Sequence, residues 1–313
     1  MSHLDPGRIE EFRLEEHGVR LMQLSFGMRL FFKGPFSEVR EGVGELWRRY
    51  LELVGKNTLT WARLGGGNRS RKVDVSVFRT IEAWLAGTKD YGETCWISVH
   101  NGPMDRLESH SFMVEGHDRQ LDWEREASYV ELNLPLDFPA VADPAALGRT
   151  LIHLAEPTVF HDGVGGFAFH RSPYKFNSTV RRMGQLGMRY QGVEIAAAER
   201  LAYLAVHGLP TVNWITFLGK ELLQRIGGPQ ALATMLPPTS PVTPLPHGVA
   251  VQSGAHPVLG DRNEPDDGLQ ALRKTYGVLR PLQFVNPNIP FSALSFDSAQ
   301  TQKWLTRLGE PHA

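Results

Sequence analysis

Apolar residues near the N-terminus predict a strand followed by a helix. Residues 19–32, VRLMQLSFGMRLFF, are apolar and partly alternating, which is typical of one long bent strand or a tight strand pair. Gly34-Pro35 ends this element, and proline suits the first turn of a helix. Apolar residues then recur every three or four positions over 36–54, with charged residues between them. This spacing predicts an amphipathic helix that ends at Gly55.

The rest of the chain alternates short strand patterns with helical patterns. Apolar or period-two runs between turn residues predict strands over 59–65, 95–103, 109–116, 128–136, 158–160, 166–171 and 248–254. Spacings of three and four predict helices over 73–85, 144–155, 194–205, 269–279 and 302–308. Within 212–228, Leu218, Leu222 and Ile226 form an i, i+4 stripe that predicts a helix capped by Gly227-Gly228. Asp143-Pro144 reads as an N-cap and first-turn pair.

The order of these elements indicates an α+β fold with mixed or antiparallel sheets and packed helices. Several prolines mark a break near residues 136–145, which divides the chain into an N-terminal α+β half, 1–140, and a C-terminal α+β half, 141–313. The halves place strands and helices in similar order, so two similar units or one continuous domain both fit. The segment 237–248 holds five prolines in twelve residues, which predicts a stiff extended connection and not a helix or central strand.

Composition narrows the classes of protein that fit. Hydrophobic residues make up 42% and charged residues 21% of 313, as in ordinary globular proteins. The formal net charge is -1, so no general attraction to nucleic acid or to an anionic membrane is expected. The charged N-terminus lacks a secretory signal, and no apolar run approaches the about 20 residues that cross a bilayer. The single cysteine, Cys95, lies in an apolar run. We therefore expect a buried thiol in a soluble, cytoplasmic protein.

Motifs for nucleotide binding and nucleophilic catalysis are missing from the sequence. There is no glycine-rich loop ending in Gly-Lys-Ser/Thr and no Gly-x-Ser-x-Gly. The run GGGNRSRK over 65–72 carries Arg69, Arg71 and Lys72 before an expected helix start, where an anion could bind. A flexible loop with a solvated basic edge is the favoured interpretation. The sequence therefore predicts no cofactor.

Two sets of histidines and aspartates resemble parts of metal or catalytic sites. They flank glycine-containing runs and comprise His161, Asp162 and His170, and His110, His117 and Asp118. Neither set supplies enough ligands for zinc, so solvent-exposed histidines at two hairpins are the favoured interpretation and no metal is expected. Paired carboxylates for glycoside hydrolysis stay open, because their spacing is set in space.

Tryptophans could form a stacking platform for bases or sugars. The candidates are Trp61, Trp84, Trp96, Trp123, Trp214 and Trp304. Most lie on the apolar face of an expected element, so burial in the core is the favoured interpretation.

Several blocks of the chain resemble the type VI immunity family of TsiV-like proteins. The C-terminal blocks are TVNWITFLGKELLQRIGG, GVAVQSGAHPVLGDRN and KTYGVLRPL, and two earlier blocks are LFFKGPFSEVREGVGELWRRYLELVG and RYQGVEIA. Glycines and core residues carry most of the likeness, which therefore indicates fold more than mechanism. These residues are Tyr190, Gly192, Asn213, Trp214, Gly227, Gly228, Gly254, Pro257, Gly260, Asp261 and Asn263.

The resemblance implies an immunity protein that binds and neutralises a co-encoded toxin of a type VI secretion system, a nuclease in some members. It implies no enzyme activity, no catalytic residue and no direct contact with nucleic acid or membrane. A nuclease groove must be positive to hold phosphates, so the acidic, exposed loop 261–267 is the candidate toxin contact. Asp261 is expected to fix its own turn, which leaves Glu264, Asp266 and Asp267. A solvated loop without a role is the alternative.

Two other classes of function remain open at this point. One is a hydrolase or transferase with a site assembled from dispersed carboxylates and histidines, such as His161, Asp162 and His170. The other is a scaffold subunit of a secretion apparatus. A toxin gene beside this gene would favour immunity, whereas an isolated gene or a metabolic operon would weaken it.

Overall fold

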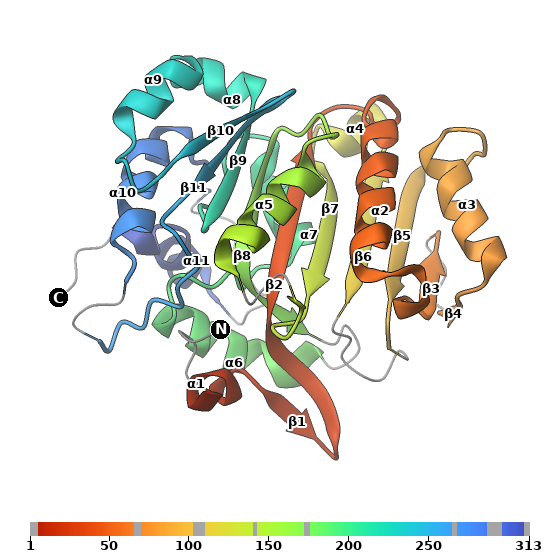
Figure 1. Cartoon of the computed structure of the whole chain (residues 1–313), viewed down its shortest axis with the longest axis horizontal. Coiled ribbons are helices and arrows are strands. Elements are labelled where there is room, and N and C mark those ends of the chain that lie inside the picture. The colour runs from red at the N-terminus through yellow and green to blue at the C-terminus, as the bar shows by residue number, and fades with distance from the viewer. Residues whose placement is uncertain are drawn as a thin grey trace.

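A single large sheet organises the chain (Figure 1). The computed structural model describes residues 6–65, 70–102, 110–139, 143–171, 176–264, 268–286 and 296–309. Within these residues, 11 strands pair in antiparallel fashion, and helices cover much of the sheet. The expected α+β class is therefore confirmed.

The long strand β2 occupies the middle of the sheet. Across the sheet the strands follow in the order β10 (Val242–Leu245), β11 (Gly248–Gln252), β9 (Ile215–Gly219), β8 (Asp162–Arg171), β2 (Val19–Phe32), β7 (Ser128–Leu134), β6 (Ser111–His117), β5 (Thr94–His100), β3 (Trp61–Leu64) and β4 (Arg71–Lys72). The short β1 (Leu14–Glu16) pairs with the start of β2. The apolar run 19–32 is thus one long strand. It also joins strands of both expected halves, whose division near residue 140 stays a prediction.

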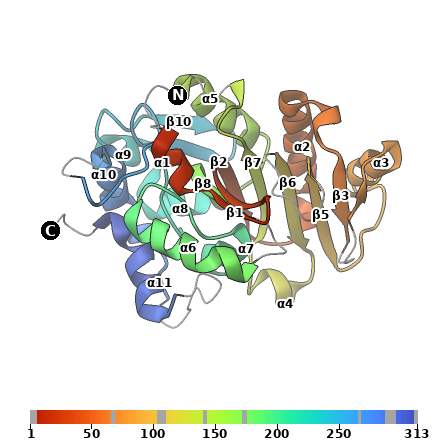
Figure 2. The ribbon, with the colours of Figure 1, turned by 90° about the horizontal axis from the view of Figure 1, so that it is seen from below.

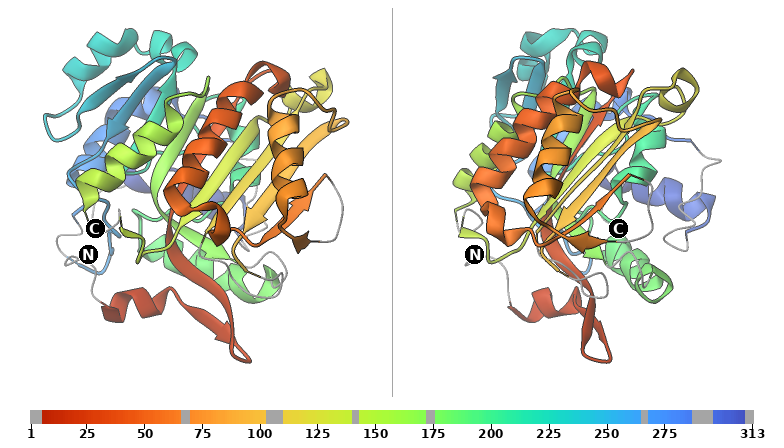
Figure 3. Two further views of the ribbon diagram at one scale, coloured as in Figure 1. Left: turned by 45° about the vertical axis from the view of Figure 1, so that its right-hand side comes forward. Right: turned by 90° about the vertical axis from the view of Figure 1, so that its right-hand side faces the viewer.

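Helices lie on both faces of the sheet. α2 (Arg40–Val54), α3 (Val75–Leu85) and α5 (Pro144–Ala155) lie on one face, and α6 (Phe176–Arg189) and α7 (Ala198–Ala205) on the other (Figure 3). The other helices are α1 (Pro6–Glu11), α4 (Gln120–Trp123), α8 (Lys220–Arg225), α9 (Gly228–Met235), α10 (Gln270–Leu279) and α11 (Ser298–Leu305). Short 3-10 segments are η1 (Phe36–Glu38), η2 (Lys56–Thr58), η4 (Arg280–Leu282) and η6 (Arg307–Gly309).

Local sequence signals place several of these boundaries correctly. α2 ends at Gly55, whose φ of 82° suits glycine. The Asp143 carboxylate accepts a hydrogen bond from the Ala145 amide at 2.9 Å, and Pro144 occupies the first turn of α5. Both predicted helix ends are therefore confirmed.

The prediction for the proline-rich segment 237–248 is confirmed, whereas that for residues 158–160 is wrong. Within the first, β10 is an edge strand that pairs with β11, and Pro244 is tolerated there because an edge strand leaves backbone amides unpaired. The expectation that this segment is neither helical nor a central strand is confirmed. The strand expected over 158–160 is wrong, because these residues form the connection between α5 and β8.

The segment 212–228 is not a single helix, which corrects the sequence-based prediction. Residues 215–219 form β9, and Leu218 lies opposite Val249 of β11. Helix α8 starts only at Lys220, and Gly227 precedes α9 with a φ of 87°. A strand that is buried on both faces of a sheet is apolar throughout and shows no period of two. The apolar residues of β9 therefore fit the spacing of a helix in the sequence.

A hydrophobic core separate from the larger cluster around β2 joins α8 to β11 and α10. Leu222 is fully buried there, in contact with a cluster that also includes Leu218, Val249, Val251 and Leu272. We expect Leu222→Ala to lower the free energy of unfolding by about 2–5 kcal/mol, through lost burial and the cavity left behind. Chemical denaturation measures this change. The matched control is Leu121→Ala, because Leu121 is 63% exposed and should change stability by at most about 0.5 kcal/mol. Equal effects of the two substitutions would contradict this core.

No helix in the part of the chain that the structure describes is long and apolar enough to cross a membrane.

Candidate functional site

The loop after β11 is held by a buried carboxylate. Asp261 is only 3% exposed, and Arg189 of α6 binds it through two nitrogens, with Nε 2.9 Å from Oδ1 and Nη2 2.6 Å from Oδ2. These hydrogen bonds are the largest cause that lowers the pKa of Asp261. The Asn263 amide also donates to Oδ1, at 3.0 Å, so the expected turn-fixing role is confirmed. The expectation that Asp261 is exposed is wrong. Its arginine partner is distant in sequence, so the local pattern does not reveal the burial.

The same arginine attaches the N-terminal helix. Nη1 of Arg189 lies 2.7 Å from Oε2 of Glu11, and the Tyr190 hydroxyl donates to the same oxygen at 2.9 Å. Phe12 is fully buried, with its ring centroid 4.7 Å from that of Tyr190. Figure 2 shows α1 beside α6. The residues around Tyr190 and Asp261 therefore fix the N-terminal segment to the body of the protein.

The predicted toxin contacts can be placed only in part. Glu264 forms an ion pair with Arg8 of α1, and the second nitrogen of this arginine lies 3.2 Å from Oε2. The Glu264 side chain is 38% exposed, so part of it still faces solvent. Asp266 and Asp267 lie outside the described residues. Toxin binding by these three carboxylates stays a prediction.

The other residues that carry the family likeness support the backbone. The side-chain oxygen Oδ1 of Asn213 accepts from the Trp214 amide at 2.7 Å, and Trp214 Nε1 donates to the Gly254 carbonyl at 3.1 Å. Gly254 and Gly260 have φ values of 87° and 70°, which few other residues adopt. These positions hold β9, β11 and the following loop together and carry no reactive group.

The two histidine sets are not exposed hairpin tips, which corrects the expectation. They lie on the continuous strands β8 and β6 or beside their ends, and four of the residues are buried: His117, His161, Asp162 and His170. GVGGF lies inside β8, where a Cβ atom on Gly163 would lie 2.5 Å from the Arg29 carbonyl oxygen of β2, so glycine allows the close approach of the two strands. His110 and Asp118 are half-buried, and the Asp118 carboxylate accepts from the Ser37 amide at 2.7 Å.

The residues proposed for a dispersed hydrolase site do not converge. Asp162 begins β8 and His170 lies eight residues further on, which is roughly 26 Å along an extended strand. His161 contacts Glu221 instead, with Nδ1 3.7 Å from Oε2, and burial lowers the pKa of His161 to about 4. Among the described residues, no group of three or more His, Cys, Asp or Glu side chains is arranged to hold a metal ion.

Cys95 and the tryptophans test the expected core. Cys95 is fully buried, and burial raises the pKa of its thiol to about 12, which makes the thiolate nucleophile inaccessible at neutral pH. Of the six candidate tryptophans, Trp84, Trp214 and Trp304 are buried as expected. The other three, Trp61, Trp96 and Trp123, are only half-buried, which corrects the expectation. Trp61 and Trp96 belong to strands near one edge of the sheet.

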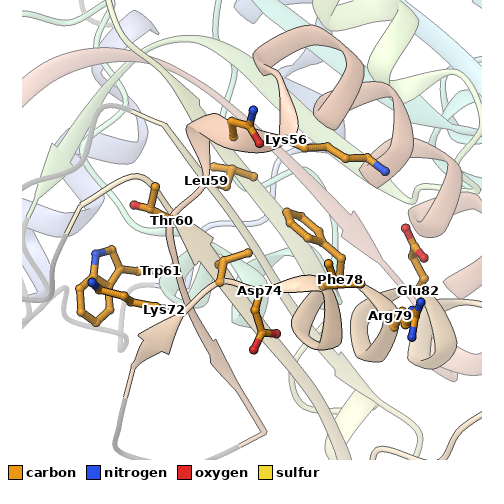
Figure 4. Close-up of a pocket in the computed structure, with 12 residues that line it drawn as sticks. Lys56, Leu59, Thr60, Trp61, Lys72, Asp74, Phe78, Arg79 and Glu82 are labelled. Atoms are coloured by element: carbon orange, nitrogen blue, oxygen red, sulfur yellow. The ribbon is translucent and has the colours of Figure 1, made fainter.

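A groove of about 710 Å³ lies between β3, β4 and α3 (Figure 4). In Figure 4, Trp61 and Lys72 lie at one end and Arg79 and Glu82 at the other. The Asp74 carboxylate caps α3 by accepting from the Val77 amide at 3.0 Å, so it is already engaged and gives no free base.

The described residues of the run 65–72 do not support an anion site. Arg71 and Lys72 form the edge strand β4, and α3 begins only after its cap at Asp74. Their side chains are exposed, as the solvated-edge interpretation expects. Residues 66–69, which include Arg69, lie outside the described residues.

Comparisons with known proteins agree with the likeness found in the sequence. The family model TsiV, described as type VI immunity for VRR-NUC, matches residues 43–308. The chain is similar in structure to the Pseudomonas aeruginosa T6SS protein PA0821, with a TM-score of 0.77 and 19% sequence identity over 95% of this chain and 87% of that chain. At this identity the structural likeness concerns the fold alone. No curated protein matches the chain.

Proposed function

This chain belongs to the TsiV family of type VI immunity proteins for VRR-NUC, and on that basis we propose that it binds a VRR-NUC nuclease toxin and blocks its activity. The observation that carries the proposal is the family match over residues 43–308, which includes every residue of the C-terminal likeness. The protein acts by binding and not by catalysis, in the cytoplasm where such a toxin would meet nucleic acid.

Occlusion of the nucleic-acid groove is the mode of inhibition that charge favours. A nuclease binds phosphates with positively charged groups, so an acidic surface on the immunity protein competes with nucleic acid and speeds encounter. In the 261–267 loop, Asp261 is buried against Arg189, which leaves Glu264, Asp266 and Asp267 as the proposed contacts. Arg8 neutralises part of the charge of Glu264.

Inhibition of the purified toxin tests the proposed function. Added at a one-to-one molar ratio, the protein should abolish cleavage of DNA by its cognate VRR-NUC nuclease and should form a stable complex with it. A nuclease of another class, without the VRR-NUC fold, should remain active in the same mixture. Failure to bind the cognate toxin, with the folded state verified by circular dichroism, would contradict the immunity function itself.

Neutralising the loop tests the proposed contacts. The variant Glu264→Gln/Asp266→Asn/Asp267→Asn should slow association with the toxin at low salt and reduce its salt dependence, because long-range attraction is lost. Its free energy of unfolding should fall by no more than about 1 kcal/mol, since the Arg8 pair is partly exposed. The control Arg8→Gln breaks the same ion pair but keeps the acidic charge. Unchanged association of the triple variant would exclude this loop from the interface while leaving inhibition intact.

A further inference from the structure

One face of the sheet near its β4 edge is polar and aromatic. Strand register aligns side chains of β3, β5, β6, β7 and β2 in rows across this face. One row is Arg63, Ser98, Met113, Glu131 and Arg29, and a second is Trp96, Glu115 and Tyr129. Because side chains alternate along a strand, all of these residues share one face. We call it the β3–β6 face.

Exposure differs sharply between the two faces of these strands. Below α2 and α3, the side chains of β5 and β6 are fully buried: Cys95, Ile97, Val99, Phe112 and Val114. On the β3–β6 face, Trp96, Ser98, Met113 and Glu115 are all half-buried. Helix α7 contacts β7 and β2, towards the middle of the sheet (Figure 3). An antiparallel sheet with one packed face presents the other face to solvent or to a partner.

The side chains on this face and at its rim are those that anchor protein interfaces. The guanidinium of Arg63 lies 4.5 Å from the ring centroid of Trp96, and Trp61 is half-buried on the same strand as Arg63. At the rim, Leu121 of α4 is 63% exposed and Tyr203 of α7 is 42% exposed. Tryptophan, tyrosine and arginine dominate the binding energy of protein interfaces.

Carboxylates gather at the end of the face next to α7. The Tyr129 hydroxyl donates to Glu115 at 2.7 Å, and the Tyr203 hydroxyl donates to Glu126. Burial, followed by the charge of Glu115, raises the pKa of Glu126 to about 7. The two carboxylates therefore repel each other in a partly desolvated position. A cation from a partner would relieve this repulsion.

A buried histidine nitrogen lies near one of these carboxylates, that of Glu115. His117 Nε2 has no hydrogen-bond partner and lies 3.9 Å from Oε1 of Glu115. The His117 side chain is 10% exposed. Thus the acidic end of the face combines an unsatisfied buried nitrogen with two carboxylates and exposed apolar groups, which the fold alone does not explain.

We propose that the β3–β6 face, with Glu115 and Glu126 at its acidic end, docks against the cationic nucleic-acid groove of the VRR-NUC toxin. This rests on the proposed function. Lysine or arginine side chains that hold phosphates in the toxin would lie against Glu115 and Glu126, while Trp96 packs against the surface beside them. Charge complementarity selects this occupant, because a nuclease groove must be positive. The acidic loop 261–267 belongs to a different part of the molecule, so the loop and the β3–β6 face are alternative contacts for this groove. The association rates of their charge-neutralised variants decide between them.

The charge of the face is tested by Glu115→Gln/Glu126→Gln. Glutamine keeps the shape and can still accept the tyrosine hydrogen bonds, so the variant should fold. Stopped-flow association with the cognate nuclease at low salt should slow by about tenfold and should depend less on salt. The control Glu41→Gln/Glu52→Gln replaces two carboxylates at exposed positions of α2, on the opposite face, and should change the rate by less than twofold.

The outcomes distinguish failure of the proposed contact surface from failure of the proposed immunity function. If the parent protein binds and inhibits the nuclease but the two double variants associate at equal rates, the β3–β6 face is not the contact, although immunity holds. If the parent does not bind, the proposed function itself fails. A second variant, Trp96→Ala, should speed dissociation of the complex by at least about tenfold if this residue anchors the interface. An unchanged dissociation rate in a folded Trp96→Ala protein would also overturn the proposal.

Discussion

Arg307→Ala is expected to lower the free energy of unfolding by about 3–5 kcal/mol, because it removes one of two buried charged groups, Arg307 and Glu194, that compensate each other. Arg307 of η6 is 3% exposed, and burial lowers the pKa of its guanidinium to about 10, so it remains charged at neutral pH. Its charge acts on Glu194, which is fully buried. Without Arg307, that carboxylate keeps its desolvation cost but loses a compensating charge.

Arg307 also makes specific contacts that alanine cannot replace. Nε donates to the Gln191 carbonyl at 2.8 Å, and Nη1 donates to the Trp304 carbonyl at 3.1 Å. The guanidinium lies 4.0 Å from the centroid of the Trp304 ring. These contacts attach the C-terminal residues to the segment that follows α6.

Denaturation by urea measures the effect of Arg307→Ala. The control Arg280→Ala, at an exposed arginine of the neighbouring η4, should cost at most about 0.5 kcal/mol. The double variant Arg307→Ala/Glu194→Gln should lose less than the sum of the two single losses, because a neutral partner no longer needs the missing charge. Strict additivity would contradict electrostatic coupling between Arg307 and Glu194.

Asp162→Asn is expected to stabilise the protein increasingly as the pH rises above about 4. Asp162 is fully buried, and neither carboxylate oxygen has a hydrogen-bond partner. Burial raises the pKa of Asp162 well above its ordinary value. The folded protein therefore keeps this carboxyl protonated over a pH range in which the unfolded chain releases the proton.

The sign of the pH dependence follows from this difference in bound protons. Above the unfolded pKa of about 3.9, the unfolded state is favoured by about 1.4 kcal/mol for each pH unit until the folded carboxyl also ionises. Asparagine cannot ionise, so the substitution removes this pH-dependent stabilisation of the unfolded state. The stability of Asp162→Asn minus that of the parent should therefore be larger at pH 7 than at pH 4.5, by about 1–3 kcal/mol.

Thermal and urea unfolding across this pH range test the second prediction. Other groups titrate in both proteins and cancel in the difference. The control Asp137→Asn removes a carboxylate at an exposed position and so separates the effect of burial from that of the substitution itself. Parallel pH profiles for Asp162→Asn and the parent would show that Asp162 ionises normally in the folded state.

Local signals in the sequence predict much of the secondary structure. The strand over 19–32, the cap at Asp143 and the helix end at Gly55 depend on neighbouring residues, so the sequence contains the information needed to place them. The prediction for 212–228 is wrong because its apolar residues belong first to the buried strand β9 and then to the helix α8. Burial from several sides removes the periodicity on which sequence patterns depend.

The candidate site was less predictable than the fold. The acidic run 261–267 is visible in the sequence, but its first carboxylate is occupied by Arg189, 72 residues away. The β3–β6 face was missed, although alternation in 95–103 and 109–116 already separates polar from apolar positions. What the pattern lacks is the order of the strands, which brings Glu115 and Trp96 together.

The sequence by itself determined the α+β class, most strands and helices, and membership of an immunity family, because periodicity, capping residues and family blocks are local properties of the chain. The tertiary structure alone decided which charges are buried, which histidines face the core and which sheet face stays uncovered. Those features depend on strand register and on contacts between distant segments, as between Asp261 and Arg189 or between Glu194 and Arg307. Desolvation and pairing act on atoms that folding brings together, so no local pattern records them.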